Sequence, residues 1–205
     1  MPNACLYLHE LIDIVGTGSE AYKAHTGKLG SDRTDGGAPL VGTWQQSGST
    51  GTWPIVVNLW EMRGWDHWAE ILERQYTRSS GQEPALKEWW TEATQWRSGG
   101  FDRILIPAAY SPTRDEIIAA GVRGAGCLQE IATLKPGTAE RYLAAVGGAW
   151  RRAMSRRGIA LLGAYRTATR AWRQRARAWR VDYRETLLVP SPWCVHHPDW
   201  RDNPS

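Results

Sequence analysis

Residues 5–14, with the sequence CLYLHELIDI, decide the fold of this protein. The stretch is short and apolar and is followed by Gly16 and Gly18, a pattern that predicts a buried β-strand. His9 and Glu10 are adjacent within it, so a strand directs their side chains to opposite faces of the sheet. Because the rest of the strand is apolar, each of these polar groups needs a hydrogen-bond or charge partner, or it has a functional role.

The chain that follows alternates between strand and helix patterns. The expected elements are a helix over 19–28, strands over 40–46 and 54–62, helices over 65–76 and 84–96, and a strand over 101–107. Strand, helix, two strands, helical segment and strand is the order of a ferredoxin-like βαββαβ unit. Such a unit has a four-stranded antiparallel sheet with its helices on one face, so the expected fold class is α+β.

The second half of the sequence resembles the first. Three segments match in the same order: LHEL at 8–11 with LQEI at 128–131, LVGTW at 40–44 with LLGAY at 161–165, and residues of 89–107 with residues of 172–190. Ordered matches over both halves predict a tandem duplication of one βαββαβ unit. We expect a first ferredoxin-like unit over 1–112, a linker over 113–125, a shortened second unit over 126–192, and a Pro/Trp-rich tail over 193–205.

The second unit lacks a counterpart of roughly residues 47–84. In the first unit that stretch holds the third strand and the helix that carries Trp65 and Trp68. Either the deletion is real and a strand over 161–167 pairs directly beside 127–134, or a segment is absent from the sequence as printed. The sequence leaves both possibilities open.

Composition restricts the class of protein. The 205 residues are 42% hydrophobic and 22% charged, with a mean hydropathy of −0.48, which is typical of a soluble globular protein. No apolar run is long enough for a membrane span, and we expect no secretory signal. Cys5, Cys127 and Cys194 are odd in number and far apart, which favours a reducing compartment and predicts a cytoplasmic protein.

Arginine is concentrated between residues 151 and 184. Such a stretch could bind nucleic acid or phosphate. The formal net charge is only +4, however, and the arginines alternate with pairs such as Ala171-Trp172 and Ala178-Trp179. This spacing favours amphipathic helices that pack their tryptophans, so we expect no nucleic-acid partner.

Four segments together resemble the NIPSNAP-like proteins of the dimeric α+β barrel superfamily. They are LYLHEL at 6–11, LQEIATLKPGTAERY at 128–142, LLGAYRT at 161–167, and LLVPSP at 187–192 after a Trp-rich helix. The resemblance implies that two sheets face each other and close a barrel, with a ligand cavity between them and a possible homo-oligomer. The superfamily includes cofactor-free monooxygenases, decyclases, lyases, haem-binding proteins and members with no known activity. The stretch missing from the second unit departs from the family pattern.

Glu10 and Glu130 occupy matching positions on the first strand of each unit. Burial would raise the pKa of such a carboxyl towards that of a general base, although a salt bridge to a neighbouring arginine is the simpler interpretation. The repeat favours Glu10 facing the barrel interior with Glu130 opposite. If His9 faces inward instead, it is the acid–base candidate, and because Gln129 replaces it in the second unit the site would lie in one half only.

Other residues are candidates for the cavity wall. Aromatic side chains on the predicted strands could line an apolar pocket, although core packing is simpler, and Arg103 or Arg166 could hold an anionic oxygen. His25 and His67 are expected on helix surfaces. Cys194, His196, His197 and Asp199 fit no standard metal spacing, and no nucleotide motif is present, so we expect no metal or cofactor. The substrate-binding candidates are Tyr7, Trp44, Trp60, Arg103, Tyr110, Tyr165 and Arg166.

The sequence supports two functional hypotheses. The first is an enzyme of small-molecule metabolism that binds an apolar or aromatic, oxygen-bearing compound in the barrel cavity. It would act by cofactor-independent acid–base chemistry, as an isomerase, a lyase or a cofactor-free monooxygenase, with Glu10, His9 or Glu130 as catalytic groups. The second is a non-catalytic protein that binds a ligand such as haem or uses its Trp-rich helices for interaction.

Overall fold

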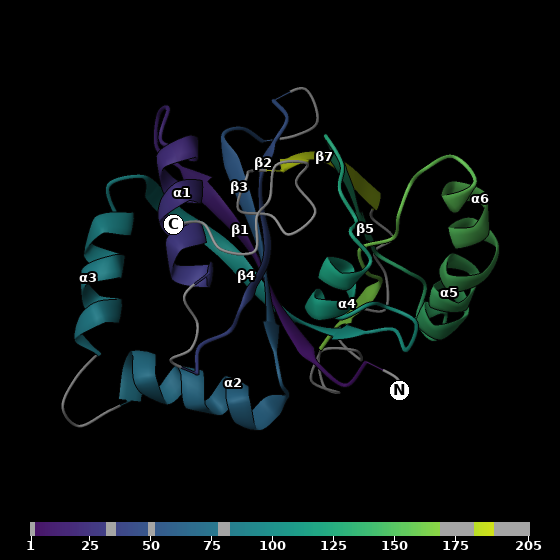
Figure 1. Ribbon diagram of the computed structural model, residues 1–205, viewed down its shortest axis with the longest axis horizontal. Coiled ribbons are helices and arrows are strands. Elements are labelled where there is room, and N and C mark those ends of the chain that lie inside the picture. The colour runs from purple at the N-terminus through teal and green to yellow at the C-terminus, as the bar shows by residue number, and fades with distance from the viewer. Residues whose placement is uncertain (1–2, 32–35, 49–51, 78–82, 169–182, 191–205) are drawn as a thin grey trace.

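The computed structural model describes residues 3–31, 36–48, 52–77, 83–168 and 183–190. Its strands form a seven-stranded sheet in the order β5-β7-β2-β3-β1-β4-β6 (Figure 1). Every pair of neighbouring strands is antiparallel. The strands are β1 (Leu6–Ile14), β2 (Leu40–Gln46), β3 (Ile55–Met62), β4 (Arg97–Pro107), β5 (Cys127–Ala132), β6 (Tyr165–Thr167) and β7 (Tyr183–Pro190).

The first half forms the expected ferredoxin-like unit. Strand β1 lies between β3 and β4, and β2 pairs with the other edge of β3, so the four strands have the ferredoxin order. The helices α1 (Ser19–Ser31), α2 (Trp65–Leu72) and α3 (Pro84–Ala93) lie on one side of these strands (Figure 1). A π-helical turn, Glu73–Thr77, continues α2. The predicted α+β class and strand order are confirmed.

Strand β4 begins four residues earlier than predicted, at Arg97 instead of residue 101. The segment Ser98-Gly99-Gly100 has the composition of a loop, yet it pairs with the end of β1. Gly100 has φ of +153°, and a Cβ there would lie 2.5 Å from the carbonyl oxygen of Leu11. The glycine therefore permits this close approach of the two strands.

The strands of the second half extend both edges of the first unit. β7 pairs with β2 on one side and with β5 beyond it, while β6 pairs with β4 on the other side. Of the two possibilities that the sequence left open, the one in which 161–167 pairs directly beside 127–134 is therefore wrong. Among the described strands, β5 and β6 end the sheet and are not paired with each other. In a complete second ferredoxin-like unit, the third strand would lie between β5 and β6.

Further helices connect the strands of the second half. The predicted linker 113–125 contains the short helix α4 (Arg114–Ala119). Thr113 and Glu116 form a capping box at its N-terminus. The segment after β5 forms α5 (Ala139–Ala145), a π-helical turn (Val146–Trp150) and α6 (Arg151–Ser155).

Strand alternation divides the core between the two faces of the sheet. The face away from α1–α3 is packed around Tyr7, Trp44, Val57, Leu59 and Leu105, and we refer to it as the barrel face. The opposite face, the helix face, carries Leu6, Trp60 and Met62 with α2, and Ile12, Ile14 and Val56 with Tyr22 of α1. Glu10 alternates with the barrel-face residues and therefore belongs to the helix face.

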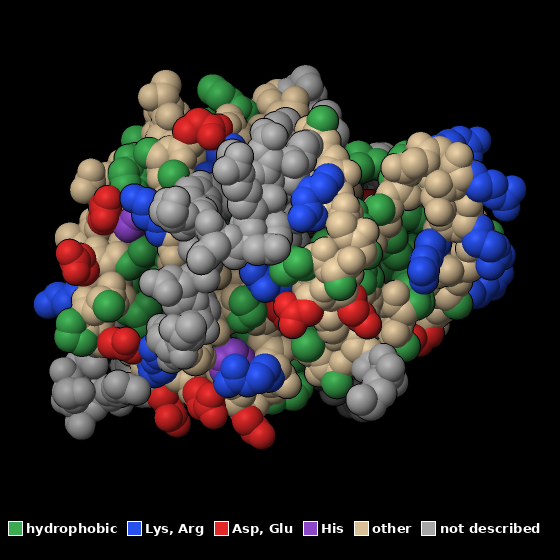
Figure 2. Space-filling view, in the orientation of Figure 1, with side chains coloured by type: hydrophobic (Ala, Val, Ile, Leu, Met, Phe, Trp, Pro, Cys, Tyr) green, Lys and Arg blue, Asp and Glu red, His purple; other side chains and the backbone are tan. Residues whose placement is uncertain are grey.

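Parts of the sequence prediction lie outside the described residues. These parts are residues 169–182 of the arginine-rich stretch and the tail with Cys194, His196, His197 and Asp199. In the described part, the side chains of Arg151, Arg152, Arg156 and Arg157 are exposed at the α6 end of the molecule, where Figure 2 shows basic groups gathered. None of the described helices is both long and apolar enough to span a bilayer.

Candidate functional site

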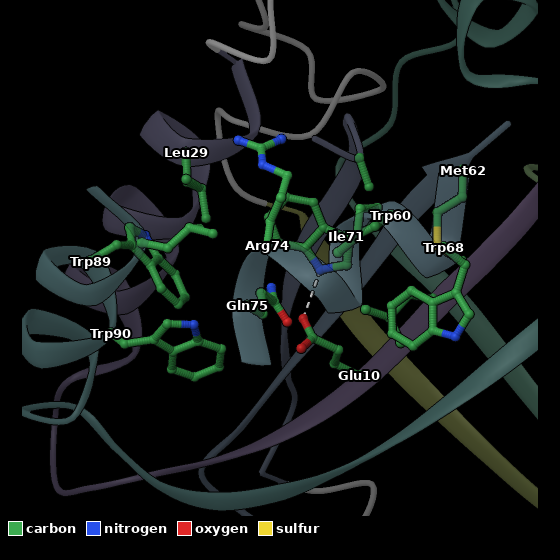
Figure 3. Close-up of a pocket in the computed structure, with 13 residues that line it drawn as sticks. Glu10, Leu29, Trp60, Met62, Trp68, Ile71, Arg74, Gln75, Trp89 and Trp90 are labelled. Atoms are coloured by element: carbon green, nitrogen blue, oxygen red, sulfur yellow. Dashed lines mark hydrogen bonds between the residues drawn. The ribbon is translucent and has the colours of Figure 1, made fainter. Parts of the chain in front are cut away.

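A pocket of about 60 Å³ lies between the helix face of the sheet and the helices α1–α3 (Figure 3). Its polar lining consists of Glu10 from β1 and of Arg74 and Gln75 from the π-helical turn. Four tryptophans from three different elements supply much of its remaining surface: Trp60 from β3, Trp68 from α2, and Trp89 and Trp90 from α3. The pocket is thus an aromatic enclosure with one carboxyl group on the strand side.

Two hydrogen bonds fix the carboxyl group of Glu10, and both end on the same oxygen. Trp60 Nε1 donates to Oε2 over 2.6 Å, and Asn58 Nδ2 donates to it over 3.1 Å. The pairing of β1 with β3 explains this, because Glu10 lies opposite Asn58. Within the described ranges, neither of these two bonds involves the other oxygen, Oε1.

Burial raises the pKa of Glu10 above its ordinary value, against the hydrogen bonds from Trp60 and Asn58 and the charge of Arg97, which act to lower it. Removal from water disfavours the carboxylate, and the nearby Asp102 acts in the same direction. A carboxyl group of this kind holds its proton to higher pH than an exposed glutamate. It can then donate the proton to a ligand oxygen or, once ionised, accept one.

Asn58 connects Glu10 to the core. Its side chain is fully buried, and Nδ2 also reaches the hydroxyl of Tyr22 at 3.4 Å. Burial raises the pKa of Tyr22 to about 12, so the phenol stays neutral. The carboxyl group of Glu10 is therefore supported by groups that are themselves held by packing.

The α3 side of the pocket is held by ring contacts. Trp89 and Trp90 meet edge to face with centroids 4.9 Å apart, and His25 of α1 stacks on Trp89 at 5.0 Å. The guanidinium of Arg97 lies over Trp90 at 4.8 Å. These contacts restrict the indole rings, so this wall is largely preformed.

The π-helical turn presents Arg74 and Gln75 to the pocket (Figure 3). Nε and Nη2 of Arg74 bind Oε2 of Glu83, at 2.9 Å and 2.8 Å. π-Helical turns within α-helices are frequent at functional sites, because the extra residue redirects the side chains around it. Here the turn follows α2 directly and supplies two polar groups of the lining.

His9 lies on the barrel face, on the opposite side of the sheet from Glu10. Its Nε2 is 2.6 Å from the side-chain nitrogen of Gln129 on β5, and the strand register places it beside Arg103 on β4. Burial, together with the positive charge of Arg103, lowers the pKa of His9 to about 3. The imidazole is therefore neutral at neutral pH.

The structure brings only part of the predicted site together. Glu10 and Trp60 share the pocket, and their catalytic and binding roles remain predictions. Glu130 is exposed, so the expectation that it faces Glu10 across the barrel is wrong. The reason is the register of β5, which turns Gln129 to the barrel face and Glu130 away from it.

The remaining candidates lie away from this pocket. Tyr7 and Trp44 are buried in the barrel-face core, and the ring of Tyr165 packs on Tyr7 at 4.8 Å. The hydroxyl of Tyr110 donates to the carbonyl of Leu143 at 2.6 Å. Nε of Arg166 lies 3.6 Å from Glu140.

His67 is not on a helix surface as expected. It is 3% exposed, accepts from the backbone N–H of Arg63 and contacts the carbonyl of Gly36 at 2.7 Å. These two contacts hold the N-terminus of α2 in place. Sequence reasoning also missed Asn58, which supports Glu10, and several residues that line the pocket. The alternation of β3 and the tryptophan spacing of α2 and α3 carried a signal for most of them: Asn58, Trp68, Arg74, Gln75, Trp89 and Trp90.

No protein-family model and no curated protein matches the chain. Among solved structures, an uncharacterized NIPSNAP domain protein from Burkholderia xenovorans is 21% identical, with a TM-score of 0.43 over 53% of this chain and 99% of its own. Proteins proposed to be monooxygenases match more of the chain. The one from Lactobacillus acidophilus NCFM is 9% identical with a TM-score of 0.57, covering 92% of this chain and 94% of its own. The one from Fusobacterium nucleatum is 7% identical with a TM-score of 0.56, covering 93% and 94%.

These similarities define the class of protein by its fold. The chain is a ferredoxin-like α+β protein, as its sheet order shows, and it shares its fold with the two longer neighbours. NIPSNAP domain proteins are among its structural neighbours. At these identities the likeness concerns the fold, and the function has to be argued from the site.

Proposed function

We propose that the pocket on the helix face binds a small apolar or aromatic compound that carries an oxygen, and that Glu10 exchanges a proton with this oxygen or with an adjacent carbon. The observation that carries the proposal is a half-buried carboxyl group with a raised pKa in a pocket walled by tryptophans. Perturbed titratable groups in apolar pockets are frequent at catalytic sites.

The chemistry of the lining suits such a ligand. Indole faces offer flat apolar contact, and the protonated form of Glu10 is a donor to a carbonyl or phenol oxygen. Because Trp60 and Asn58 hold Oε2, the carboxyl group does not need to reorient during proton transfer. The reaction classes that fit are isomerisation, elimination and cofactor-independent oxidation, each of which begins with a proton transfer.

The small volume of the pocket limits what enters it. About 60 Å³ is well below the roughly 150 Å³ of a cavity that holds benzene, so the pocket takes the edge of a ring or a substituent of a larger molecule, not a macrocycle such as haem. This favours the enzyme hypothesis over the haem-binding alternative and moves the proposed site from the barrel interior to the helix face.

We infer that residues 1–112 and 126–192 are copies of one unit, joined by 113–125 and followed by the tail 193–205. Support comes from the sheet, in which the second-half strands β6 and β7 add to opposite edges of the first unit. Further support comes from His9 and Gln129, which occupy matching positions in the two repeats and contact each other. Such contacts are expected near a pseudo-twofold axis.

We also propose that the protein is cytoplasmic and that it can form homo-oligomers.

The test uses 4-nitrophenol, whose absorption spectrum distinguishes the phenol from the phenolate. We expect binding to quench tryptophan fluorescence and to raise the pKa of the bound phenol, because the pocket is apolar and Glu10 becomes negative when it ionises. Glu10→Gln removes the negative charge of Glu10, so the pKa of the bound phenol shifts less. The matched variant Glu130→Gln behaves as wild type. Equal shifts in wild type and Glu10→Gln would contradict the assignment of Glu10.

Turnover is then screened with small aromatic ketones and phenols, following deuterium exchange and oxygen consumption. We expect Glu10→Gln to lose about 100-fold or more of any activity found, which is the usual contribution of a general acid–base group. Activity that survives the change in a folded variant would contradict the catalytic role.

A further inference from the structure

A second group of polar side chains lies on the barrel face, where the two halves meet. It consists of His9 on β1, Arg103 on β4 and Gln129 on β5. His9 and Arg103 are partners in the β1–β4 register, and Gln129 reaches His9 from the second half at 2.6 Å. The proposed Glu10 pocket is on the other face of β1, so this is a separate location.

Each of these three side chains has one buried polar atom with no hydrogen-bond partner among the described residues. The atoms are Nδ1 of His9, Nε of Arg103 and Oε1 of Gln129. Leaving a buried donor or acceptor unsatisfied destabilises the folded state. Three such atoms on neighbouring side chains indicate that a polar ligand completes the group.

The hydrogen bond to Gln129 determines which ring nitrogen of His9 carries the proton. With the amide nitrogen of Gln129 donating to Nε2, the neutral imidazole carries its proton on Nδ1. Nδ1–H of His9 and Nε–H of Arg103 are then both donors without an acceptor, and Oε1 of Gln129 is an acceptor without a donor.

Charge indicates the sign of the ligand. Arg103 is half-buried, and its guanidinium lies over Phe101 at 4.9 Å. Within the described part of the chain, no carboxylate forms an ion pair with it. Glu61, a carboxylate on the barrel face of β3, is bound instead by the hydroxyl of Tyr7 at 2.6 Å and the N–H of Arg114 at 2.7 Å. A half-buried cation without a counter-ion favours an anion beside it.

We propose that His9, Arg103 and Gln129 form a binding site for a small carboxylate at the junction of the two halves. The guanidinium supplies the charge, and the two free N–H groups supply donors for the carboxylate oxygens. Gln129 Oε1 accepts from a ligand hydroxyl where one is present, so a 2-hydroxycarboxylate binds more tightly than the simple acid. The site joins the halves, because two of its residues come from the first and one from the second.

The experiment follows the ring nitrogens of His9 by NMR during titration with acetate, glycolate and inorganic phosphate. Bound acetate neutralises Arg103, one of the two causes that hold the pKa of His9 low, so this pKa is expected to rise. Glycolate should bind more tightly than acetate. Phosphate that bound as tightly as acetate would contradict carboxylate selectivity and indicate a general anion site.

Variants separate the site from non-specific anion effects. Arg103→Gln is expected to weaken acetate binding by about tenfold or more. Arg63→Gln removes an exposed arginine elsewhere and should leave binding unchanged. If Arg103→Gln does not fold, Arg103→Lys keeps the charge but lacks the Nε donor, and weaker binding is again expected. Acetate that fails to shift the His9 resonances, or that binds equally to every variant, would overturn the proposal.

Discussion

Glu10 and Glu130 occupy the same place in two matched strands, yet their surroundings are opposite. Glu10 is enclosed by tryptophans and has a raised pKa, whereas Glu130 is exposed. The neighbouring leucines differ in the same way, because Leu8 lines the pocket and Leu128 is 57% exposed. The same local sequence therefore produces a site in one half and a surface in the other.

The missing segment explains the difference. Seven of the residues that support or line the pocket lie between residues 47 and 84, the stretch without a counterpart in the second half: Asn58, Trp60, Met62, Trp68, Ile71, Arg74 and Gln75. Without a third strand and its helix, a carboxyl at the Glu130 position lacks the aromatic enclosure that surrounds Glu10. We propose that the first-strand glutamate acts only together with that segment.

The largest expected effect compares matched tyrosines in the two halves. Tyr22 is completely buried against Ile12, Ile14 and Val56, so Tyr22→Ala should lower the free energy of unfolding by about 3–5 kcal/mol. Tyr142 is only half-buried, and Tyr142→Ala should cost about 1 kcal/mol. Urea unfolding measures both, and equal losses would mean that the second half is packed as tightly as the first.

The next effect concerns His9, whose pKa is about 3 in the folded state against an ordinary value of 6.5. Below pH 6.5 the unfolded chain takes up the proton first, so stability falls as the pH drops towards 3, by up to about 1.4 kcal/mol per pH unit. His9→Gln places the residue of the second repeat at this position and should remove that dependence. Unfolding midpoints between pH 7 and pH 4 test this, and an unchanged slope would contradict the burial of a neutral His9.

A smaller effect is expected from Trp60→Phe, which keeps an aromatic ring in the pocket but removes the donor to Glu10. The lost hydrogen bond should cost about 1–2 kcal/mol. Because this bond lowers the pKa of Glu10, the pKa should rise further in the variant. Trp89→Phe is the matched control, since Trp89 makes no hydrogen bond to Glu10, and it should leave the Glu10 titration in place. A pKa that fell in Trp60→Phe would show that the indole does not stabilise the carboxylate.

The smallest expected effect on the free energy of unfolding concerns the matched leucines Leu8 and Leu128. Leu128→Ala should change the free energy of unfolding by less than about 0.5 kcal/mol, because the side chain is exposed. Leu8→Ala removes a side chain packed against the core beside α2 and should cost about 1–2 kcal/mol. Chemical denaturation of both variants tests the contrast, and a large loss for Leu128→Ala would mean that this surface is covered in solution.

Much of the fold could be predicted because it depends on local patterns. The apolar runs of β1 and β3 and the turns between elements determine the ferredoxin order, and the repeat indicates that the second half is shortened. The pairing of β6 with β4 depends on contacts between distant strands, which periodicity does not encode. The buried position of His67 likewise depends on the Gly36 carbonyl, which is distant in the sequence.

For the site, alternation placed His9 and Glu10 on opposite faces but did not say which face carries helices. That choice follows from the path of the crossover helices, which cover the side to which Glu10 points. Asn58 and Trp60 could have been linked to Glu10 only through the β1–β3 register. The aromatic wall of α3 was visible in the sequence as tryptophans, but not its proximity to a carboxyl group.

Carboxyl titration by ¹³C NMR, on protein labelled at the glutamate side-chain carboxyl carbons, tests most directly whether Glu10 is the functional carboxyl. One resonance should titrate above the ordinary glutamate pKa of 4.5, should disappear in Glu10→Gln and persist in Glu130→Gln, and should shift when 4-nitrophenol is added. A Glu10 resonance that titrates at or below 4.5, and that is unaffected by the phenol, would contradict the proposed site.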